Sequence, residues 1–380
     1  MTTPHGWETR TLAEFIELQR GFDLPHHARR AGSYKVLSSG DAHGWHDEWK
    51  VTGPGFVVGR ATNIGRPTWS NEDFWPLNTT LFAKDFRGND PRFAYYWFLG
   101  HDLSAYNSGS VQPMLNRNYI ANVSIDVPPL TEQRSIAATL SALDEKIDSN
   151  RRASRLIGNL ASERFRAVLV ENDFSLVPLG KLTNVVKGRS YKSAELADST
   201  TALVTLKSID RNGGYKANGL KPYVGDYKHP QVVAPGEIVV AQTDLTQGAE
   251  VVGRGVRVPA SAEYETLIAS LDLAIVRPAE DMPVEYLLGL LTSDDFREWC
   301  RSRVTGTTVL HLAKDAIPTW PAPLVSPETQ RVFADDAGVL YQRLDSLAYE
   351  IERLIALRDA ILPELLSGRI RATDLEGQLV

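Results

Sequence analysis

Two long stretches with the same helical periodicity constrain this chain more than any other feature. The first covers residues 131–169, where apolar side chains recur in alternating steps of three and four residues. Such steps place them on one face of a helix: Ile136, Leu140, Leu143, Ile147 and Ile157. Asn150 and Ser154 interrupt this face. A helix of that length spans roughly 60 Å, which is longer than a globular domain needs, so we interpret it as a strut.

The second stretch repeats the first after 197 residues. The shifted apolar positions are Phe333, Ala337, Leu340, Leu344 and Leu354, and the two polar positions become Leu347 and Ile351. Gln133-Arg134 recurs as Gln330-Arg331. Solenoid repeats have periods of a few tens of residues, so this spacing does not indicate a solenoid. It predicts two similar halves, each with a globular part followed by a long helix.

The segments between the helices are doubled in the same order. Residues 34–41 correspond to 202–210, residues 53–65 to 234–248, and an amphipathic helix at 92–99 to one at 284–291. We therefore predict an α+β chain with two similar mixed α/β domains. The expected boundaries are residues 1–130 for the first domain, 131–171 for the first helix, 172–326 for the second domain, and 327–380 for the second helix with its tail.

Composition limits the class of protein. Hydrophobic residues make up 43% and charged residues 23%, which is typical of a soluble globular chain. The single cysteine, Cys300, excludes a disulfide framework and fits a reducing cytoplasm. We expect no membrane association, because neither a spanning segment nor a signal peptide is present. The net charge of -6 argues mildly against nucleic acid, yet nine basic and four acidic residues lie between Lys181 and Lys228.

No catalytic motif is evident. The chain has no Walker A sequence, and the glycines near Gly253 do not complete a dinucleotide fingerprint. The string Asp126-Val127-Pro128-Pro129-Leu130 differs from an adenine methyltransferase tetrad by an extra valine and a missing aromatic residue. His43 and His46 lie beside Asp41 and Asp47, but a polar loop explains them better than a metal site. These features indicate a binder, without a metal or a catalytic residue of its own.

Candidate base-reading residues follow a buried strand in each half. Arg60, Asn63 and Arg66 lie in and after the turn that follows the string Gly-Phe-Val-Val-Gly-Arg, and arginine and asparagine can read guanine and adenine edges in the major groove. The corresponding turn of the second half carries Gln242, Asp244 and Gln247. The alternative is that these side chains form hydrogen bonds that stabilise a β-turn.

Candidate phosphate-binding residues flank a glycine. Lys187, Arg189 and Lys192 surround Gly188, where a turn could bring amides and cations to phosphates. A solvated charged loop is the alternative. Ser110 and Thr307 follow glycines in two further loops and are weaker candidates.

The doubled arrangement, with PPLTEQRSIAATLSALDEKIDSNRR after the first domain, resembles the DNA-specificity subunit of type I restriction–modification systems. The Pro-Pro-Leu-x-Glu-Gln-Arg start of the helix and the Leu-Asp-x-x-Ile core carry the resemblance, which covers essentially the whole chain. The second copy departs from it, because it reads Pro-Ala-Pro-Leu-Val-Ser-Pro-Glu-Thr-Gln-Arg.

The resemblance implies an architecture and a set of partners. The two long helices would form an antiparallel coiled coil, and each domain would read one half of a split site in double-stranded DNA. Two modification subunits would dock on the helices and methylate adenine with S-adenosylmethionine. Restriction subunits would add cleavage that requires ATP and Mg²⁺. This chain would bind none of these cofactors, catalyse no reaction, and act in the cytoplasm.

Two rival functions stay open on the sequence. A coiled-coil scaffold would bind only proteins and use its globular domains as adaptors. A self-contained modification enzyme would need a catalytic motif, which we do not find. Binding to duplex DNA separates the first rival from a DNA reader, and methyl transfer by the purified chain tests the second.

Overall fold

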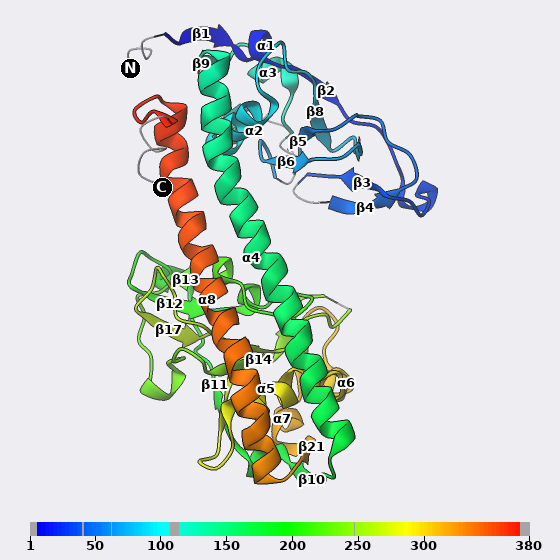
Figure 1. The fold of residues 1–380 in the computed structure, drawn as a ribbon, viewed down its shortest axis with the longest axis vertical. Coiled ribbons are helices and arrows are strands. Elements are labelled where there is room, and N and C mark those ends of the chain that lie inside the picture. The colour runs from blue at the N-terminus through cyan, green and yellow to red at the C-terminus, as the bar shows by residue number, and fades with distance from the viewer. Residues whose placement is uncertain (1–5, 40–41, 62, 107–113, 247, 373–380) are drawn as a thin grey trace. The chain divides into compact units, whose positions relative to one another are not determined.

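The computed structural model describes residues 6–39, 42–61, 63–106, 114–246 and 248–372. The chain divides into two compact units, which are described separately (Figure 1). Unit 1 comprises residues 1–145 and 356–380, and unit 2 comprises residues 146–355. The long helices α4 (Leu130–Glu171) and α8 (Pro327–Leu366) begin 197 residues apart, and each contributes to both units. No helix in the described part of the chain is long and apolar enough to cross a membrane.

Unit 1 is built on two small sheets. The four-stranded sheet has the order β2-β8-β5-β6 with antiparallel neighbours: β2 (Glu17–Arg20), β8 (Thr80–Asp85), β5 (Gly55–Gly59) and β6 (Pro67–Ser70). The three-stranded sheet β4-β3-β7 contains a parallel pair, β3 with β7: β4 (Ala42–His46), β3 (Tyr34–Leu37) and β7 (Phe74–Pro76). A separate antiparallel pair joins β1 (Glu8–Thr11) to β9 (Ser124–Val127).

Unit 2 repeats these three groups of strands and adds one further sheet. Its four-stranded sheet is β11 (Thr183–Lys187), β18 (Leu273–Pro278), β14 (Ile238–Ala241) and β16 (Gly255–Arg257). Its three-stranded sheet is β13 (Lys221–Pro222), β12 (Thr201–Val204) and β17 (Thr266–Ala269), and β12 pairs with β17 in parallel. The closing pair is β10 (Ser175–Pro178) with β21 (Pro321–Leu324). A third sheet has the order β15 (Thr243–Asp244), β20 (Leu310–Leu312), β19 (Val304–Thr305).

Short helices complete both units. In unit 1 they are α1 (Leu12–Phe15), α2 (Pro91–Gly100), α3 (Arg117–Ile120), η1 (His26–Ala28) and η2 (Ser104–Tyr106). In unit 2 they are α5 (Val284–Thr292), α6 (Asp294–Arg301), α7 (Ala316–Thr319), η3 (Leu179–Lys181), η4 (Ser193–Glu195), η5 (Leu206–Ser208), η6 (Ala217–Gly219) and η7 (His229–Gln231). The predicted helices at 92–99 and 284–291 are α2 and α5, and the predicted α+β class is confirmed.

One glycine holds the same place in each unit. A Cβ atom on Gly21 would overlap the carbonyl oxygen of Leu77, and one on Gly188 would overlap that of Ser270. Each glycine follows the first strand of its four-stranded sheet, β2 or β11. A glycine therefore recurs at this place for a steric reason, because only glycine permits so close an approach of two backbones.

The starts of the long helices differ in their capping. Ser326 caps α8, because its Oγ accepts a hydrogen bond from Thr329 N at 3.1 Å, and Pro327 occupies the first helical position. In α4, Glu132 N and Gln133 N donate to Pro129 O at 2.9 and 3.0 Å. The helix therefore begins at Leu130, one residue before the predicted start at residue 131.

The two long helices run antiparallel within each unit. In unit 1, Arg358 Nη1 lies 2.8 Å from Asp144 Oδ1, and Arg371, after the end of α8, binds Glu132 near the start of α4. In unit 2, Lys146 pairs with Glu350 and Arg164 with Asp336. In both units, advancing along α4 means going back along α8.

The predicted apolar faces lie in these packed regions. Ile136, Leu140 and Ile147 on α4 are buried, as are Phe333, Ala337 and Leu347 on α8. The remaining predicted apolar positions are partly buried: Leu143, Ile157, Leu340, Leu344, Ile351 and Leu354. In unit 1, Ile136 and Leu140 share a core with Leu362 and Leu365, while Phe165 and Phe333 pack edge to face in unit 2. Burial of these apolar side chains holds each helix pair together.

Candidate functional site

In unit 2, several chain segments meet at one end of the four-stranded sheet. Strands β11 and β14 end there and β18 begins there, since Lys187 is opposite Ala274 and Ala241 is opposite Leu273. Backbone hydrogen bonds tie the segments beyond these strand ends together. Gln242 N donates to Asp272 O at 2.7 Å, and Leu312 N donates to Gln242 O at 2.8 Å. We call this region the strand-end surface of unit 2.

Unit 1 has the same arrangement. Gly21 N donates to Thr80 O at 3.0 Å and Arg60 N to Thr79 O at 2.9 Å. Leu115 N donates to Arg60 O at 2.8 Å, as Leu312 N does to Gln242 O. Arg60 is therefore the counterpart of Gln242, and Arg20, before Gly21, is the counterpart of Lys187. The strand-end surface of unit 1 is formed by residues 20–22, 77–80 and 60, with Leu115.

The side chain of Arg60 is engaged within unit 1. Its Nη1 donates to Asn78 O at 3.0 Å, and its Nε donates to Leu115 O at 3.4 Å. Burial, and to a lesser degree the charge of Arg20, lowers the pKa of this guanidinium. Two of its donor atoms thus hold the turn, which supports the alternative that Arg60 stabilises the loop. Its role in reading bases stays a prediction.

The other two candidates of this turn are more accessible. Asn63 is exposed, and its Nδ2 donates to Ser39 O at 3.1 Å. Arg66 is also exposed, and its side chain makes no hydrogen bond to any described residue. Sequence reasoning missed Arg20, whose Nε donates to Asn78 O at 3.4 Å beside Arg60. A basic residue directly before Gly21 was the available signal.

Asp244 is a structural residue of its loop. The carboxylate is buried and accepts hydrogen bonds from Val251 N at 2.6 Å, from Val252 N at 3.1 Å, and from both N and Oγ1 of Thr246. Burial acts to raise the pKa of Asp244, but the hydrogen bonds outweigh it and the pKa is lowered. A carboxylate so fully engaged is better explained by the turn than by base recognition.

Of the remaining candidates in this turn, Gln242 is partly buried and lies in the strand-end surface. Gln247 and Ser110 lie outside the described residues. Thr307 is exposed in the hairpin between β19 and β20, and β20 pairs with β15 directly after Gln242. The predicted turn and the predicted Gly-Thr loop of the second half are therefore neighbours.

The basic residues around Gly188 differ in their surroundings. Lys187 and Lys192 are exposed, whereas Arg189 is partly buried. Arg189 Nε donates to the hydroxyl oxygen of Tyr223 at 3.4 Å, and this contact raises the pKa of the guanidinium. Lys192 stands at the start of η4, where its backbone N donates to Glu195 Oε2 at 2.6 Å. Lys187 ends β11, and Arg189 is the counterpart of Phe22 in unit 1, so both belong to the strand-end surface of unit 2.

The structure describes His43, His46 and Asp47 of the weighed metal site, whereas Asp41 lies outside the described residues. His46 is buried, accepts a hydrogen bond from Arg30 N at Nδ1 (3.1 Å), and packs edge to face against Trp75. The described residues contain no group of three or more histidine, cysteine, aspartate or glutamate residues placed to hold a metal ion.

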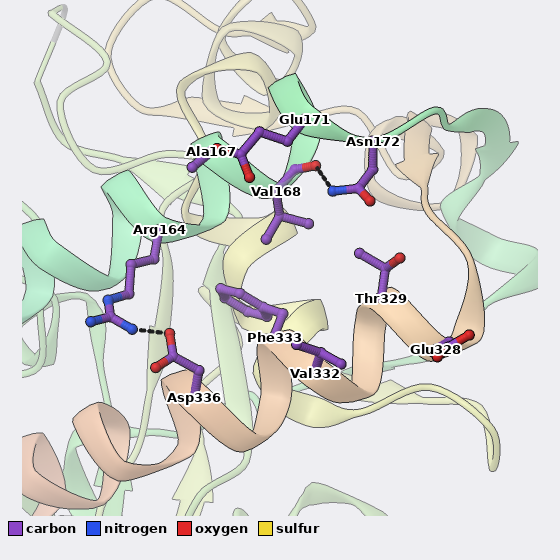
Figure 2. A pocket seen from close by; sticks show the side chains of 10 residues that line it. All are labelled: Arg164, Ala167, Val168, Glu171, Asn172, Glu328, Thr329, Val332, Phe333 and Asp336. Atoms are coloured by element: carbon purple, nitrogen blue, oxygen red, sulfur yellow. Dashed lines mark hydrogen bonds and ion pairs between the residues drawn. The ribbon is translucent and has the colours of Figure 1, made fainter.

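A groove of about 480 Å³ lies between the end of α4 and the start of α8 in unit 2. Figure 2 shows Arg164 and Asp336 joined across one end, with Phe333, Val168 and Val332 along its wall. Asn172 Nδ2 donates to Val168 O at 2.9 Å. Its mixed apolar and charged lining suits a protein side chain better than a small polar substrate.

Comparison with known proteins agrees with this organisation. Residues 4–157 match the model of the type I restriction modification DNA specificity domain. The type I restriction enzyme MjaVIII specificity subunit of Methanocaldococcus jannaschii is 20% identical over 295 residues, covering 72% of this chain and 68% of that relative. The crystal structure of the S subunit of a type I restriction–modification system from M. genitalium aligns over 96% of this chain and 97% of that chain, with a TM-score of 0.60 and 18% identity. At that identity, the structural match is evidence on the fold alone. Together these matches confirm the resemblance inferred from the sequence.

Proposed function

Residues 4–157 belong to the type I restriction modification DNA specificity domain family, and from this premise we propose that the chain reads a bipartite site in double-stranded DNA. Each of the two β-rich domains would recognise one half of that site. The observation that carries the proposal is a pair of equivalent surfaces with different side chains. The strand-end surfaces of units 1 and 2 share their backbone hydrogen bonds, yet Arg20 and Arg60 in one are Lys187 and Gln242 in the other.

Different side chains on one scaffold are what recognition of two different half-sites requires. Bases are distinguished by the donors and acceptors that their edges present in the major groove. Gln242 offers both a donor and an acceptor, whereas Arg66 and Lys187 offer only donors. Similar backbones with unequal hydrogen-bonding side chains therefore fit an asymmetric target.

Part of the DNA affinity would come from charge contacts to the phosphates. Lys187 and Lys192 are exposed, and neither makes a side-chain ion pair with a described residue. Such residues release counterions from DNA and contribute affinity that falls with salt. The overall charge of -6 is compatible with this role, because basic residues outnumber acidic residues by nine to four between Lys181 and Lys228.

We further propose that two modification subunits dock on the long helices and supply the adenine methyl transfer. Exposed apolar side chains on the unit 2 segments of α4 and α8 support this: Leu156, Leu160, Val332 and Val339. Leu156 and Leu160 lie one turn apart on α4, so they share a helix face that a partner could cover. S-adenosylmethionine, ATP and Mg²⁺ would bind those subunits and the restriction subunits, while this chain stays non-catalytic.

Exchange of one domain tests the proposal. Residues 1–130 are replaced by the corresponding domain of another specificity subunit, and bound duplexes are selected from a randomised library. One half of the selected sequence should change and the other half should persist. Exchange of residues 172–326 is the matched experiment and should change the opposite half. A change in both halves after a single exchange would show that the domains do not read independently.

The scaffold function is the second candidate, favoured by the same exposed apolar residues on α4 and α8. A gel shift with duplex DNA separates the two functions. A chain that binds modification subunits but shows no sequence preference, alone or in their complex, would be a scaffold.

A further inference from the structure

Three arginines gather beside the strand-end surface of unit 2. Arg254 lies in the turn before β16, and Arg297 and Arg301 lie one turn apart on α6, so they share a helix face. Arg254 Nε and Arg297 Nη2 both donate to Glu250 O, at 2.7 and 3.2 Å. Arg301 Nη2 donates to Gly248 O at 3.3 Å. All three guanidinium groups therefore converge on the loop that follows β15. We call them the arginine cluster.

The charge of the arginine cluster is not neutralised by direct ion pairs. Among the described residues, no carboxylate lies within 4.0 Å of any of the three guanidinium groups. The nearby Glu250 carboxylate pairs instead with Arg211 Nε at 3.3 Å. Backbone carbonyls, which carry no net charge, are the observed acceptors. Arg297 Nε is buried and has no hydrogen-bond partner. Burial and the adjacent Arg297 lower the pKa of Arg254, and these effects outweigh the opposite influence of Asp210 and Asp294.

The surrounding structure holds the cluster in place. Ser293 caps α6 by accepting from Phe296 N at 3.2 Å, and the buried Phe296 and Cys300 anchor the inner face of the helix. The loop on the opposite side is fixed by the four hydrogen bonds to Asp244. The cations are thus positioned in advance, so an anion that binds them meets an ordered site.

We propose that Arg254, Arg297 and Arg301 bind a phosphate group of the DNA backbone next to the half-site read by unit 2. Guanidinium groups present paired donors that match phosphate oxygens, and a guanidinium is less strongly hydrated than the ammonium of a lysine. Phosphate contacts set the register of a protein on the duplex, while base contacts carry the sequence. The inference rests on the proposed DNA-reading function and assigns to it a positioning site outside the predicted residues.

The test measures duplex binding by the full chain as a function of salt. Arg297→Ala combined with Arg301→Ala should weaken binding to selected and scrambled duplexes alike. The slope of log affinity against log salt should fall by about 0.9 for each phosphate that the variant no longer neutralises. Arg301→Ala alone is the milder variant, because this exposed side chain holds only the Gly248 carbonyl. Arg151→Ala is the charge-matched control, since Arg151 is exposed on α4 and pairs with Asp148, and it should leave the slope unchanged.

A second experiment distinguishes binding of the DNA backbone from binding of a free phosphate ion. Inorganic phosphate should raise the melting temperature of the parent chain, and Arg254→Gln should abolish that shift. If the parent binds DNA and the cluster variants keep its salt slope, the assignment to the DNA backbone is overturned, even where free phosphate still binds. Altered base preference with an unchanged slope would also overturn it. Failure of the parent to bind any duplex, alone or in complex with modification subunits, refutes the proposed function itself, and the phosphate arm then decides whether the cluster is an anion site.

Discussion

Gln133 and Gln330 make the same hydrogen bond in the first turns of two different helices. In each, Nε2 donates at 2.9 Å to the backbone carbonyl five residues earlier, that of Pro128 or of Val325. Each glutamine side chain is buried, and each joins its helix to the residue that directly follows the preceding strand, β9 or β21. The 197-residue repeat therefore preserves an interaction and not only a residue type.

The two glutamines should differ in their contribution to stability. Gln133 also donates to Asn89 Oδ1 at 2.9 Å and accepts from Asp90 N at 2.8 Å. Gln133→Leu leaves three buried groups unpaired and should lower the free energy of unfolding by about 2–4 kcal/mol, against about 1–2 kcal/mol for Gln330→Leu. Urea denaturation of both variants measures the difference. Equal losses would mean that the contacts to Asn89 and Asp90 contribute nothing.

Phe333 and its neighbour Val332 form a matched pair on α8. Phe333 is 3% exposed and packs edge to face on Phe165, with a centroid distance of 5.4 Å, whereas Val332 is 65% exposed. Phe333→Ala should cost about 3–5 kcal/mol, because it removes this packing and leaves a cavity behind. Val332→Ala should change stability by less than about 0.5 kcal/mol. Thermal unfolding compares the two, and similar losses would contradict the helix packing of unit 2.

Asp244 should make stability depend on pH in the acid range. Its pKa is lowered in the folded chain by hydrogen bonds that outweigh the effect of burial. The unfolded chain therefore holds the proton more tightly. The stabilisation is complete above the unfolded pKa of about 3.9 and is lost as the pH falls through the folded pKa. The difference in unfolding free energy between the parent and Asp244→Asn should be about 2–3 kcal/mol near pH 7 and should shrink below about pH 4. A difference that is constant with pH would show that the charge of Asp244 has no such role.

The reactivity of the Cys300 thiol should report the unfolding of unit 2. The thiol is fully buried, and burial raises its pKa to about 12. At pH 8 the native thiol should therefore resist a disulfide reagent, since the thiolate is the reactive form. Labelling should follow the unfolding transition of unit 2 as urea is added. Rapid labelling of the native chain would contradict the packing of α6.

Alanine substitutions of Lys187 and Arg60 should affect different properties, DNA affinity in the first case and stability of the chain in the second. Lys187→Ala should weaken binding to every duplex and reduce the salt slope by about 1, because the ammonium is exposed at the end of β11. Arg60→Ala should instead lower the free energy of unfolding by about 1–2 kcal/mol, because two backbone carbonyls lose their donor. Salt titrations and denaturation curves test the pair. Loss of one base preference in Arg60→Ala without loss of stability would make Arg60 a reader.

The overall fold was more predictable from the sequence than the roles of individual side chains. Helical periodicity and the 197-residue repeat predict both long helices, and Gly21 and Gly188 mark equivalent close approaches that the structure explains. The roles of Asp244 and Arg60 were not predictable, because their partners, Val251 and Asn78, are defined only by loop geometry. Sequence spacing likewise gives no sign of the arginine cluster. Arg254 and Arg297 are far apart along the chain and meet only through the shared carbonyl of Glu250.

The antiparallel pairs β1 with β9 and β10 with β21 have a consequence for how domains can be exchanged between genes. Glu8 lies opposite Val127 in β1 and β9, and Ser175 lies opposite Leu324 in β10 and β21, so each domain leaves its sheet beside the point where it entered. A genetic crossover within the helix-coding stretches transfers a domain whose ends already meet. No new closing contact has to evolve afterwards. Under the proposed function, in which each domain reads one half-site, a single recombination event would give a host lineage a new half-specificity and leave the other half unchanged.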